Sequence, residues 1–425
     1  MSNEILKKAS DAYAALAAFR SNRERLLAYT FGRQWIELMR DSDGKIISEA
    51  QFFDRCGRKP VTVNLLRRLI RTLLGNFRSR CDGIYSELPP EIVDGNNLRE
   101  IDARLFEEFI ISGCAIQKVS HARRRSGGGP LVENINPSRF FVNQIYDPRG
   151  SDIDLIGSIN DYSMARFIKY FSSGTKKHVR ALEGIFMANA GNRSALESDI
   201  SYLAADKFLS SDDKISVVEI WSLEPLGNTE NPGPDYPVAW HEKHFAPDGT
   251  VVLDRFHSPE VSHPYSVKFY PLIGGEIHSF IEDLVDNQRT INRLLTSFEE
   301  SMSVAAKGVL LFPQDQLLTT MSFEDVGKLW AQPDSVIPLS GRGSEQPKQV
   351  ITNVNSSGIV PVLEMQLRLL DEVSGINDVL KGSRLGSTVG AETYKRIIDN
   401  ADAGITDLIK SFESLIRDRN GKLLA

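Results

Sequence analysis

The sequence offers two groups of side chains that could hold a metal ion, and the first is the pair His241 and His244. They stand in the segment HEKH, within an alternating stretch, VAWHEKHFAPDGTVVLDRF, that is typical of a β-strand. In a strand, residues three positions apart point to opposite faces, so this spacing does not bring the two imidazoles together. The sequence shows no obvious third ligand beside them. We therefore expect these histidines to be surface residues and expect no metal site here.

The second group is a set of carboxylates, formed by Asp147, Asp152, Asp154 and Asp161. Oxygen ligands of this kind suit hard cations such as Ca²⁺ and Mg²⁺. Aspartates in such segments are also common turn formers and helix caps, and this is the role that we expect. The alternative is a metal-dependent nuclease or hydrolase that uses the loop formed by residues 147–161.

The sequence lacks the motifs of several common enzyme classes. It has no G-x-x-x-x-G-K-[ST] phosphate loop, no G-x-S-x-G nucleophile elbow and no H-E-x-x-H metal motif. No G-x-G-x-x-G fingerprint follows a predicted strand. We therefore expect a protein that is not an enzyme and that uses no cofactor.

The composition is that of a soluble globular protein, with 41% apolar, 25% charged and 8% aromatic residues among 425. This length suggests two or three packed units. No uncharged apolar run reaches the roughly 18–20 residues that cross a bilayer, and the N-terminal segment lacks the apolar centre of a signal peptide. We therefore expect no membrane contact and no export. The three cysteines form no C-x-x-C pair, and we expect them to be reduced thiols.

The charge is unevenly distributed along the chain. The net charge is −6, whereas residues 1–130 contain 22 Lys and Arg against 16 Asp and Glu, so the remainder carries −12. An acidic chain argues against a dedicated nucleic-acid-binding protein, whose contact surface is usually basic. It is compatible with a protein that touches DNA locally or lets DNA pass.

Helical patterns dominate the first 130 residues and position a basic stripe. We expect helices over residues 4–39, 63–79 and 98–117. In the second of these, leucines and isoleucine cover one side, and three arginines fall within about 40° of one another on the opposite side. The three residues of this basic stripe are Arg67, Arg71 and Arg78. The stripe either faces phosphate or a partner, or it is a solvated face or a set of salt bridges between subunits.

Strand patterns follow. A Gly127–Gly129 turn separates two alternating runs, which is a hairpin signal. A second β region over about 215–270 predicts an antiparallel meander or half-barrel. We expect a short helix at 160–173 and no clear element over 174–212, which is polar and weakly periodic. The fold class predicted from these patterns is α+β.

The apolar period changes to three or four residues from Glu276 onward. It predicts a long helix to about Ala305 with a narrow apolar seam, which suits packing between subunits or on a flat sheet. Short strands are expected at 308–313 and 349–354, and two further helical segments follow up to Arg417.

Four stretches, taken in order, resemble the portal (head–tail connector) proteins of tailed bacteriophages, especially the podovirus-like branch. The first is the segment FGRQW at Phe31–Trp35, followed by the Pro-x-Thr-x-Asn of Pro60–Asn64 and a helix that in the family ends in Gly, here Gly75. The other three are INPSRFFVNQIYDPRGSDIDLIG, DLVDNQRTINRLLTSFEESM, and DEVSGINDVLKGS with STVGAETYKRI. Together they are spread over about residues 30–415.

The resemblance implies a portal-like fold: an α/β wing with antiparallel strands and long helices, including a stem-type helix, that assembles as a ring. It divides the chain into a mostly helical part of the wing (1–130), a β-rich wing region (131–275), a long helix with the α/β wing core (276–390), and a C-terminal helix at the possible start of a stem (391–425). Only eight residues follow Arg417, so the β-rich clip and the crown of the family are not evident in the sequence.

The function that the resemblance implies is structural. The protein would form a ring, usually of twelve copies, at one capsid vertex of the virion, assembled in the bacterial cytoplasm. The ring would be the channel for double-stranded DNA during packaging and ejection. Its partners would be the major capsid protein, the terminase large subunit and adaptor or head-completion proteins. The alternatives are another virion structural or adaptor protein, or the metal-dependent hydrolase or nuclease considered above.

Four polar residues of the long helix are candidates for hydrogen bonds between subunits in such a ring: Asn287, Gln288, Asn292 and Ser297. The alternative for these residues is an exposed polar face of the helix.

Overall fold

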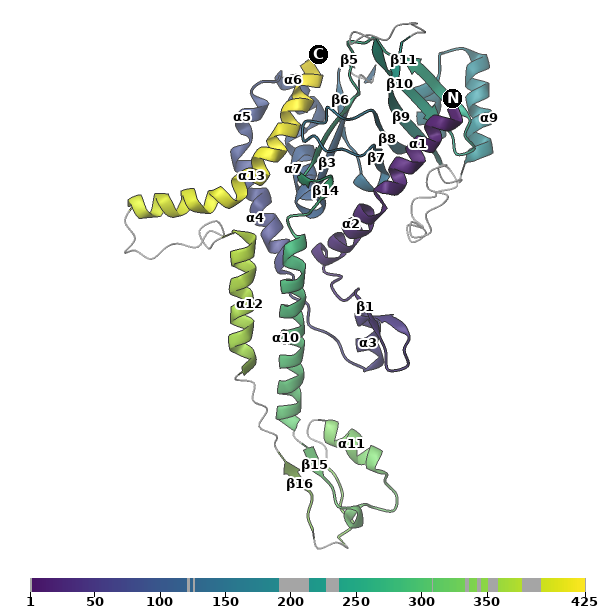
Figure 1. The fold of residues 1–425 in the computed structure, drawn as a ribbon. Helices are drawn as coiled ribbons and strands as arrows, with labels where there is room; N and C mark the ends of the chain where they lie inside the picture. Colours follow the sequence, from purple (N-terminus) through teal and green to yellow (C-terminus); the bar gives the residue numbers. More distant parts are fainter. Residues whose placement is uncertain are drawn as a thin grey trace. The chain divides into compact units, whose positions relative to one another are not determined.

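A computed structural model of the chain describes residues 2–120, 123–124, 127–190, 214–226, 237–307, 309–332, 336–341, 345–350, 358–376 and 391–424 (Figure 1). Their helices and antiparallel strands form a mixed α+β fold, which confirms the predicted class. The chain divides into two compact units. Unit 1 comprises Met1–Phe31, Leu66–Asp283 and Gly375–Ala425, and unit 2 comprises Gly32–Leu65 and Leu284–Ser374.

The helices of unit 1 come from its beginning, its middle and its end. They are α1 (Ser2–Ala15), α2 (Ala17–Thr30), α4 (Leu65–Arg80), α5 (Asp82–Tyr85), α6 (Pro90–Asn96), α7 (Leu98–Ser112), α8 (Met164–Phe171), α9 (Lys176–Asn189) and α13 (Ala391–Leu424), with the 3₁₀ turn η1 (Pro137–Arg139). α4 begins at Leu65, one residue before the part of the chain that belongs to unit 1.

Two antiparallel sheets make up the centre of unit 1. The five-stranded sheet has the order β11-β10-β9-β8-β7 and the three-stranded sheet has the order β12-β3-β6. Their strands are β3 (Cys114–Ser120), β6 (Leu131–Asn134), β7 (Phe140–Val142), β8 (Leu155–Ser163), β9 (Lys214–Pro225), β10 (Val238–Phe245), β11 (Val251–Phe256) and β12 (Tyr265–Phe269). Two short pairs accompany them, β4 (Arg123–Arg124) with β5 (Gly127–Gly128) and β13 (Pro271–Ile273) with β14 (Glu276–Ile277). The β3–β6 pairing confirms the predicted hairpin, and the β9–β10–β11 pairing confirms the meander. The turn expected at Gly127–Gly129 is wrong, because Gly127 and Gly128 form strand β5.

Alternate side chains of β9 point to the two faces of the larger sheet, and different elements cover each face. Val218 and Ile220 point to the face on which α1 packs through Ala9 and Tyr13. The other face is covered partly by α8 and α9 at Val217, and partly by the three-stranded sheet, whose core lies around Trp221. Polar residues on this second face, such as Glu219, are therefore buried between the larger sheet and the elements that cover it.

Two predicted helices end earlier than expected, in each case at a glycine, and one observed helix was not predicted. The helix expected over 4–39 is broken at Leu16 and ends at Thr30, because Gly32 has a φ of +87° that a right-handed helix excludes. The helix expected over 98–117 ends at Ser112, since Gly113 has a φ of +72°. The helix that was not predicted, α9, falls in the polar stretch for which no element was expected. Only Leu182 and Phe186 of α9 belong to the core around them, so its periodic signal is weak.

The C-terminal helix α13 is fastened to unit 1 through a buried ion pair. Arg419 is fully buried and its Nη2 lies 3.0 Å from Oδ2 of Asp102 on α7, which is equally buried. The same carboxylate accepts hydrogen bonds from Tyr85 and Gln117. Phe412 of α13 packs among aromatic rings of α4 and α7. A buried charge is tolerated only when it is paired in this way.

Unit 2 is built around two longer helices, α10 (Glu282–Lys307, whose first two residues lie in unit 1) and α12 (Ile359–Ser374). Between them the chain forms β15 (Val309–Leu311), the 3₁₀ turn η3 (Gln314–Gln316), α11 (Phe323–Ala331) and β16 (Lys348–Val350), and β15 pairs with β16 antiparallel. The earlier segment of unit 2 contributes the hairpin β1 (Leu38–Arg40) and β2 (Ile46–Ser48), then α3 (Glu49–Arg55). The predicted strands at 308–313 and 349–354 correspond to β15 and to an earlier β16.

No helix among the described residues combines the length and the apolar character needed to cross a bilayer. The three cysteines, Cys56, Cys81 and Cys114, are free thiols, as expected.

A close backbone approach in unit 1 gives the first test. Gly157 of β8 leaves no room for a Cβ atom, which would lie 2.1 Å from the backbone oxygen of Glu219 and 2.4 Å from Cζ of Phe141. We predict that Gly157→Ala destabilises the protein by about 1–3 kcal/mol, because a backbone atom cannot move aside as a side chain can. Gly184→Ala on α9 is the control. Its Cβ meets nothing within 4 Å, so it should stabilise by about 0.4–1 kcal/mol. Thermal unfolding measures both, and equal Tm values would contradict the packing argument.

A second test concerns His263, which precedes β12. Burial, with the nearby Lys422 of α13 as a smaller cause, lowers the pKa of His263 to about 3 from an ordinary value of 6.5. The unfolded chain therefore binds more protons between these pH values, so this histidine makes stability fall as the pH drops from 6.5 toward 3. We predict that His263→Gln flattens this part of the stability profile. His278→Gln, at a side chain that is 58% exposed, should leave the profile unchanged. Chemical denaturation at a series of pH values would measure the difference, and identical slopes for the wild type and His263→Gln would contradict the assignment.

Candidate functional site

Helix α10 binds an extended segment of unit 2 through a ladder of side chains. Oε1 of Gln288 accepts a hydrogen bond from the backbone N–H of Leu65 at 2.9 Å, and Oδ1 of Asn292 accepts one from Val63 at 3.0 Å. Thr296 Oγ1 accepts a third, from Val61, also at 3.0 Å. Gln288 in addition donates from Nε2 to the carbonyl oxygen of Val63 at 2.6 Å.

The spacing of this ladder has a simple geometric origin. The three side chains stand four residues apart on the helix, which corresponds to a rise of about 6 Å. Their backbone partners stand two residues apart on extended chain, which spans about 6.6 Å. The two repeats match closely enough for three successive rungs. Residues 61–65 thus satisfy alternate N–H groups without joining a sheet.

The ladder also gathers residues that are far apart in the sequence. Asn292 donates from Nδ2 to Oε1 of Gln34, and the indole of Trp35 donates to Oγ1 of Thr62 at 2.9 Å. The FGRQW segment, the Pro-x-Thr-x-Asn segment and the Gln-x-x-x-Asn of the long helix therefore meet in one place. Ion pairs reinforce the contact, since Glu49 of α3 binds both Arg289 and Arg293 of α10.

The four predicted interface candidates divide into two kinds. Gln288 and Asn292 are buried, with exposed fractions of 0% and 1%, and their amides are bonded within the chain as described above. Asn287 is half-buried and Ser297 is exposed. For Gln288 and Asn292 the structure thus provides an internal role in place of an exposed polar face. A contact of Asn287 or Ser297 with another subunit stays a prediction.

The basic stripe is largely neutralised within unit 1. Arg67 forms an ion pair with Glu107 and lies over the ring of Phe31, and Arg78 pairs with Glu100 at 2.7 Å. Arg71 is exposed, and in the part of the chain that the structure describes no ion pair with it is found. Arg67 and Arg78 therefore form salt bridges within the subunit. Of the three arginines, Arg71 is the one whose contact with phosphate or a partner stays a prediction.

The aspartates of residues 147–161 serve mainly as turn residues, as predicted. Asp147 accepts hydrogen bonds from the backbone and side chain of Arg149, and Asp152 accepts from the N–H groups of Tyr146 and Asp147. The side chain and backbone of Arg149 and the hydroxyl of Ser151 hold the pKa of Asp147 well below its usual range. Asp161 differs, because it lies in β8 and pairs with Arg139 at 2.5 Å. These four carboxylates do not converge on one point.

The prediction that His241 and His244 are surface residues is wrong. They are 4% and 0% exposed, because β10 is an interior strand of the sheet and both of its faces are covered. The alternation argument itself holds. His241 is bonded to Glu224 and Asp254 on one face, whereas His244 is bonded to Glu242 on the other.

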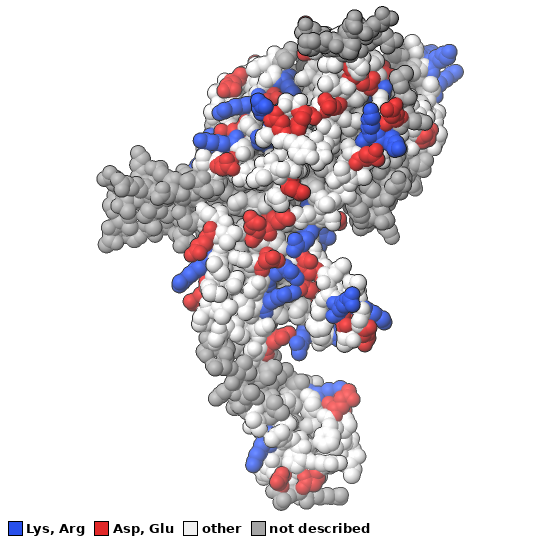
Figure 2. All heavy atoms as spheres, in the orientation of Figure 1, with Lys and Arg blue, Asp and Glu red and all other residues white. Residues whose placement is uncertain are grey.

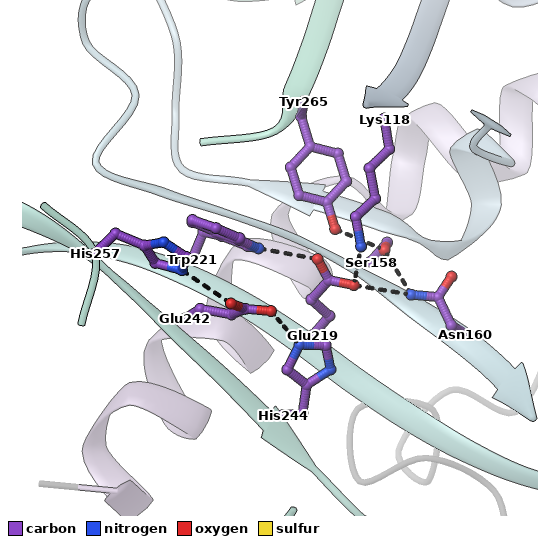
Figure 3. Close-up of polar contacts among 9 residues, drawn as sticks. All are labelled: Lys118, Ser158, Asn160, Glu219, Trp221, Glu242, His244, His257 and Tyr265. Carbon is purple, nitrogen blue, oxygen red and sulfur yellow. Dashed lines mark hydrogen bonds and ion pairs between the residues drawn. The ribbon is translucent and has the colours of Figure 1, made fainter. Parts of the chain in front are cut away.

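His244 belongs to a buried charge cluster that the sequence did not reveal (Figure 3). Glu219 and Trp221 of β9 stand directly opposite His244 and Glu242 of β10 in the strand register. Across the layer, Lys118 of β3 places its ammonium 2.5 Å from Oε2 of Glu219, with side-chain exposures of 7% and 0%. The indole of Trp221 donates to Oε1 of the same carboxylate at 2.9 Å.

The second carboxylate of the cluster is held by two imidazoles. His244 Nε2 lies 2.9 Å from Oε1 of Glu242, and His257 Nε2 lies 2.9 Å from its Oε2. Burial alone would raise the pKa of Glu242, but its hydrogen-bonded and electrostatic interaction with His244, followed by the hydrogen bond of His257 and the charge of Lys118, outweighs burial and lowers the pKa to about 2. For Glu219, burial likewise acts to raise the pKa, and the ammonium of Lys118 overrides it and lowers the pKa. Both carboxylates are therefore ionised at neutral pH.

Sequence reasoning missed this cluster for a definite reason. Glu219 and Lys118 are 101 positions apart and lie in different sheets, so no local spacing connects them. One available signal was the presence of charged residues in strands that otherwise read as apolar, such as Glu219 within KISVVEIW.

Neither models of known protein families nor the curated proteins compared with this sequence gave a match. The functional argument therefore depends on the residues and geometry of this chain.

The ladder of α10 can be tested directly. We predict that Gln288→Ala with Asn292→Ala lowers the hydrogen-exchange protection of Val63 and Leu65 several-fold, because each N–H loses a hydrogen bond with a net contribution of about 0.5–1.5 kcal/mol. Ser297→Ala, on the same helix at an exposed position, is the control and should change nothing. Hydrogen exchange followed by mass spectrometry measures both variants. Undiminished protection in the double variant would show that the ladder does not hold residues 61–65.

Proposed function

We propose that this chain is a portal-type structural subunit of a tailed bacteriophage. In this proposal, copies of the chain form a ring, usually of twelve, at one vertex of the capsid, and double-stranded DNA passes through it during packaging and ejection. The observation that carries the proposal is the convergence in unit 2. Three of the family-like segments, recognised separately in the sequence, bond to one another through Gln34, Trp35 and Asn292.

An exposed apolar stripe on α12 supports self-association. Val362, Met365, Leu369 and Val373 repeat at spacings of three and four residues and are 40%, 50%, 37% and 53% exposed. The buried residues of the same helix, Leu370 and Ser374, fall roughly a quarter turn away at 100° per residue. An exposed apolar stripe on a helix is a common mark of a protein contact, and a neighbouring copy in a ring would cover it.

The segment between α10 and α12 is our candidate for the clip. The family resemblance implies a β-rich element that meets terminase or adaptor proteins. Here β15 and β16 form a two-stranded sheet with apolar side chains in the open, among them Leu311 at 55% and Val350 at 45% exposure. Phe323 at the start of α11 is also 51% exposed. We infer that these residues meet the terminase large subunit or an adaptor protein.

The charge distribution suits a channel that does not retain DNA. On the face shown in Figure 2, where residues are coloured, acidic and basic side chains are interspersed and no broad basic area is seen. Each phosphate that binds Lys or Arg adds affinity through counterion release, which would have to be broken at every step of translocation. The internal ion pairs of Arg67 and Arg78 keep two arginines of the basic stripe from acting in this way.

The proposed role needs no catalytic residue and no cofactor. The alternative of a metal-dependent nuclease or hydrolase depends on Asp152 and Asp154 acting together. Asp152 instead caps a turn and Asp154 is exposed. Another virion structural or adaptor protein is the remaining alternative, and the oligomeric state of the purified chain distinguishes it from a portal ring.

We predict that the purified chain assembles into rings of about twelve copies and that Met365→Lys with Leu369→Lys prevents this while leaving a folded monomer. Lysines on the stripe place charges where a neighbouring subunit would bury them, which costs several kcal/mol for each contact. Glu364→Lys adds a lysine to the charged side of the same helix, about 100° from Met365, and should leave assembly intact. Native mass spectrometry with negative-stain imaging gives the subunit number. A wild-type monomer, or rings that are indifferent to the stripe, would exclude this mode of assembly.

A further inference from the structure

The buried charge cluster of unit 1 has the donor atoms of a metal site. Glu219, Glu242 and His244 each offer one ligand atom, and these atoms all lie within 4.8 Å of one another. All three residues are buried, and two adjacent strands fix their backbones in register. Only modest side-chain movement is needed to bring two carboxylate oxygens and one imidazole nitrogen to the roughly 2.0–2.2 Å that Zn²⁺ requires.

The cluster concentrates negative charge in a small buried space. Glu219 and Glu242 place two carboxylates there, and the ammonium of Lys118 pairs with the first of them. The remaining contacts of Glu219 come from the neutral Trp221 and Asn160. Two carboxylates held together away from water favour a further cation between them, and a divalent ion bound by both would supply it.

Two features of the surroundings fit a metal site. Nδ1 of His244 is buried and has no hydrogen-bond partner among the described residues, so this nitrogen is available as a ligand. The outer contacts also resemble those that orient metal ligands. Trp221 and Lys118 fix Glu219, while His257 fixes Glu242 through its second oxygen.

We propose that Glu219, Glu242 and His244 bind one divalent first-row transition-metal ion, with Zn²⁺ as the fitting probe. Mixed carboxylate and imidazole ligands suit Zn²⁺ better than they suit Mg²⁺ or Ca²⁺, which prefer oxygen alone. The ion enters as the chain folds, because the site is closed in the folded state. Its role is structural: it fastens β9 to β10 beside the ion pair that reaches β3.

The proposal is tested on the full chain by metal analysis and thermal unfolding. The wild-type chain, refolded with Zn²⁺ and then dialysed, should retain about one ion per chain. Its Tm should rise by about 3–6 °C at a hundredfold excess of Zn²⁺ over Kd and fall on chelation. His241→Gln, which alters the buried histidine on the opposite face of β10, should behave like the wild type. His244→Gln should retain no ion and show no shift of Tm.

Two results would overturn the proposal. One is a wild-type chain that retains no Zn²⁺ and whose Tm does not respond to the ion, which means that the hydrogen bonds and the ion pair of the cluster suffice without a metal ion. The other is equal metal retention by His244→Gln. If His244→Gln fails to fold, the wild type loaded with Co²⁺ provides the measurement instead. Its visible spectrum should show a low-symmetry site of nitrogen and oxygen ligands, and the spectrum of hexaaqua Co²⁺ alone contradicts the assignment.

Discussion

The ion pair between Lys118 and Glu219 is the constraint on which the two-sheet arrangement of unit 1 depends. It joins β3 of the smaller sheet to β9 of the larger one at a point where neither side chain reaches water. An ion pair in such a place adds little net stability, because desolvation offsets attraction, but it strongly disfavours any packing that separates the partners. Shifting β9 by one residue would move Glu219 to the face that α1 covers and leave Lys118 unpaired. The charge pair thus selects one register among several that hydrophobic burial would allow.

In unit 2 the side chains of a helix hold the segment of residues 61–65, which belongs to no sheet. The side chains of α10 replace the missing neighbouring strand, because a four-residue step on a helix nearly equals a two-residue step on extended chain. Amides at Gln288 and Asn292 suit this task since each carries a donor and an acceptor. The ion pairs of Glu49 with two arginines of the same helix reinforce the attachment.

The buried ion pair and the side-chain ladder fix the packing within each unit, and the exposed apolar surface of unit 2 indicates a function in assembly. In unit 2 the apolar stripe of α12 and apolar side chains of β15 and β16 are exposed to solvent, whereas the amide of Gln288 is bonded within the chain. A rigid body with an uncovered apolar surface is expected of a subunit that completes its packing in an assembly. This is the physical basis on which we prefer a ring-forming structural protein to an enzyme.

The sequence by itself determined the α+β class, the antiparallel pairing of the runs on either side of Gly127–Gly129, most of the long helix and the turn role of Asp147 and Asp152. The glycines expected as the turn are strand β5 in part, and the long helix begins at Glu282 instead of Glu276. The features that the sequence determined follow from local periodicity or local turn chemistry, which a few neighbouring residues decide. It did not determine the α9 helix, the burial of His241 and His244, or the partners of Gln288 and Lys118. Those depend on which strand or helix lies opposite in space, and Lys118 and Glu219 are brought together from 101 positions apart only by the packing of two sheets. Tertiary structure alone decided that a histidine in an alternating strand is buried, since alternation states which residues share a face and not whether that face is covered.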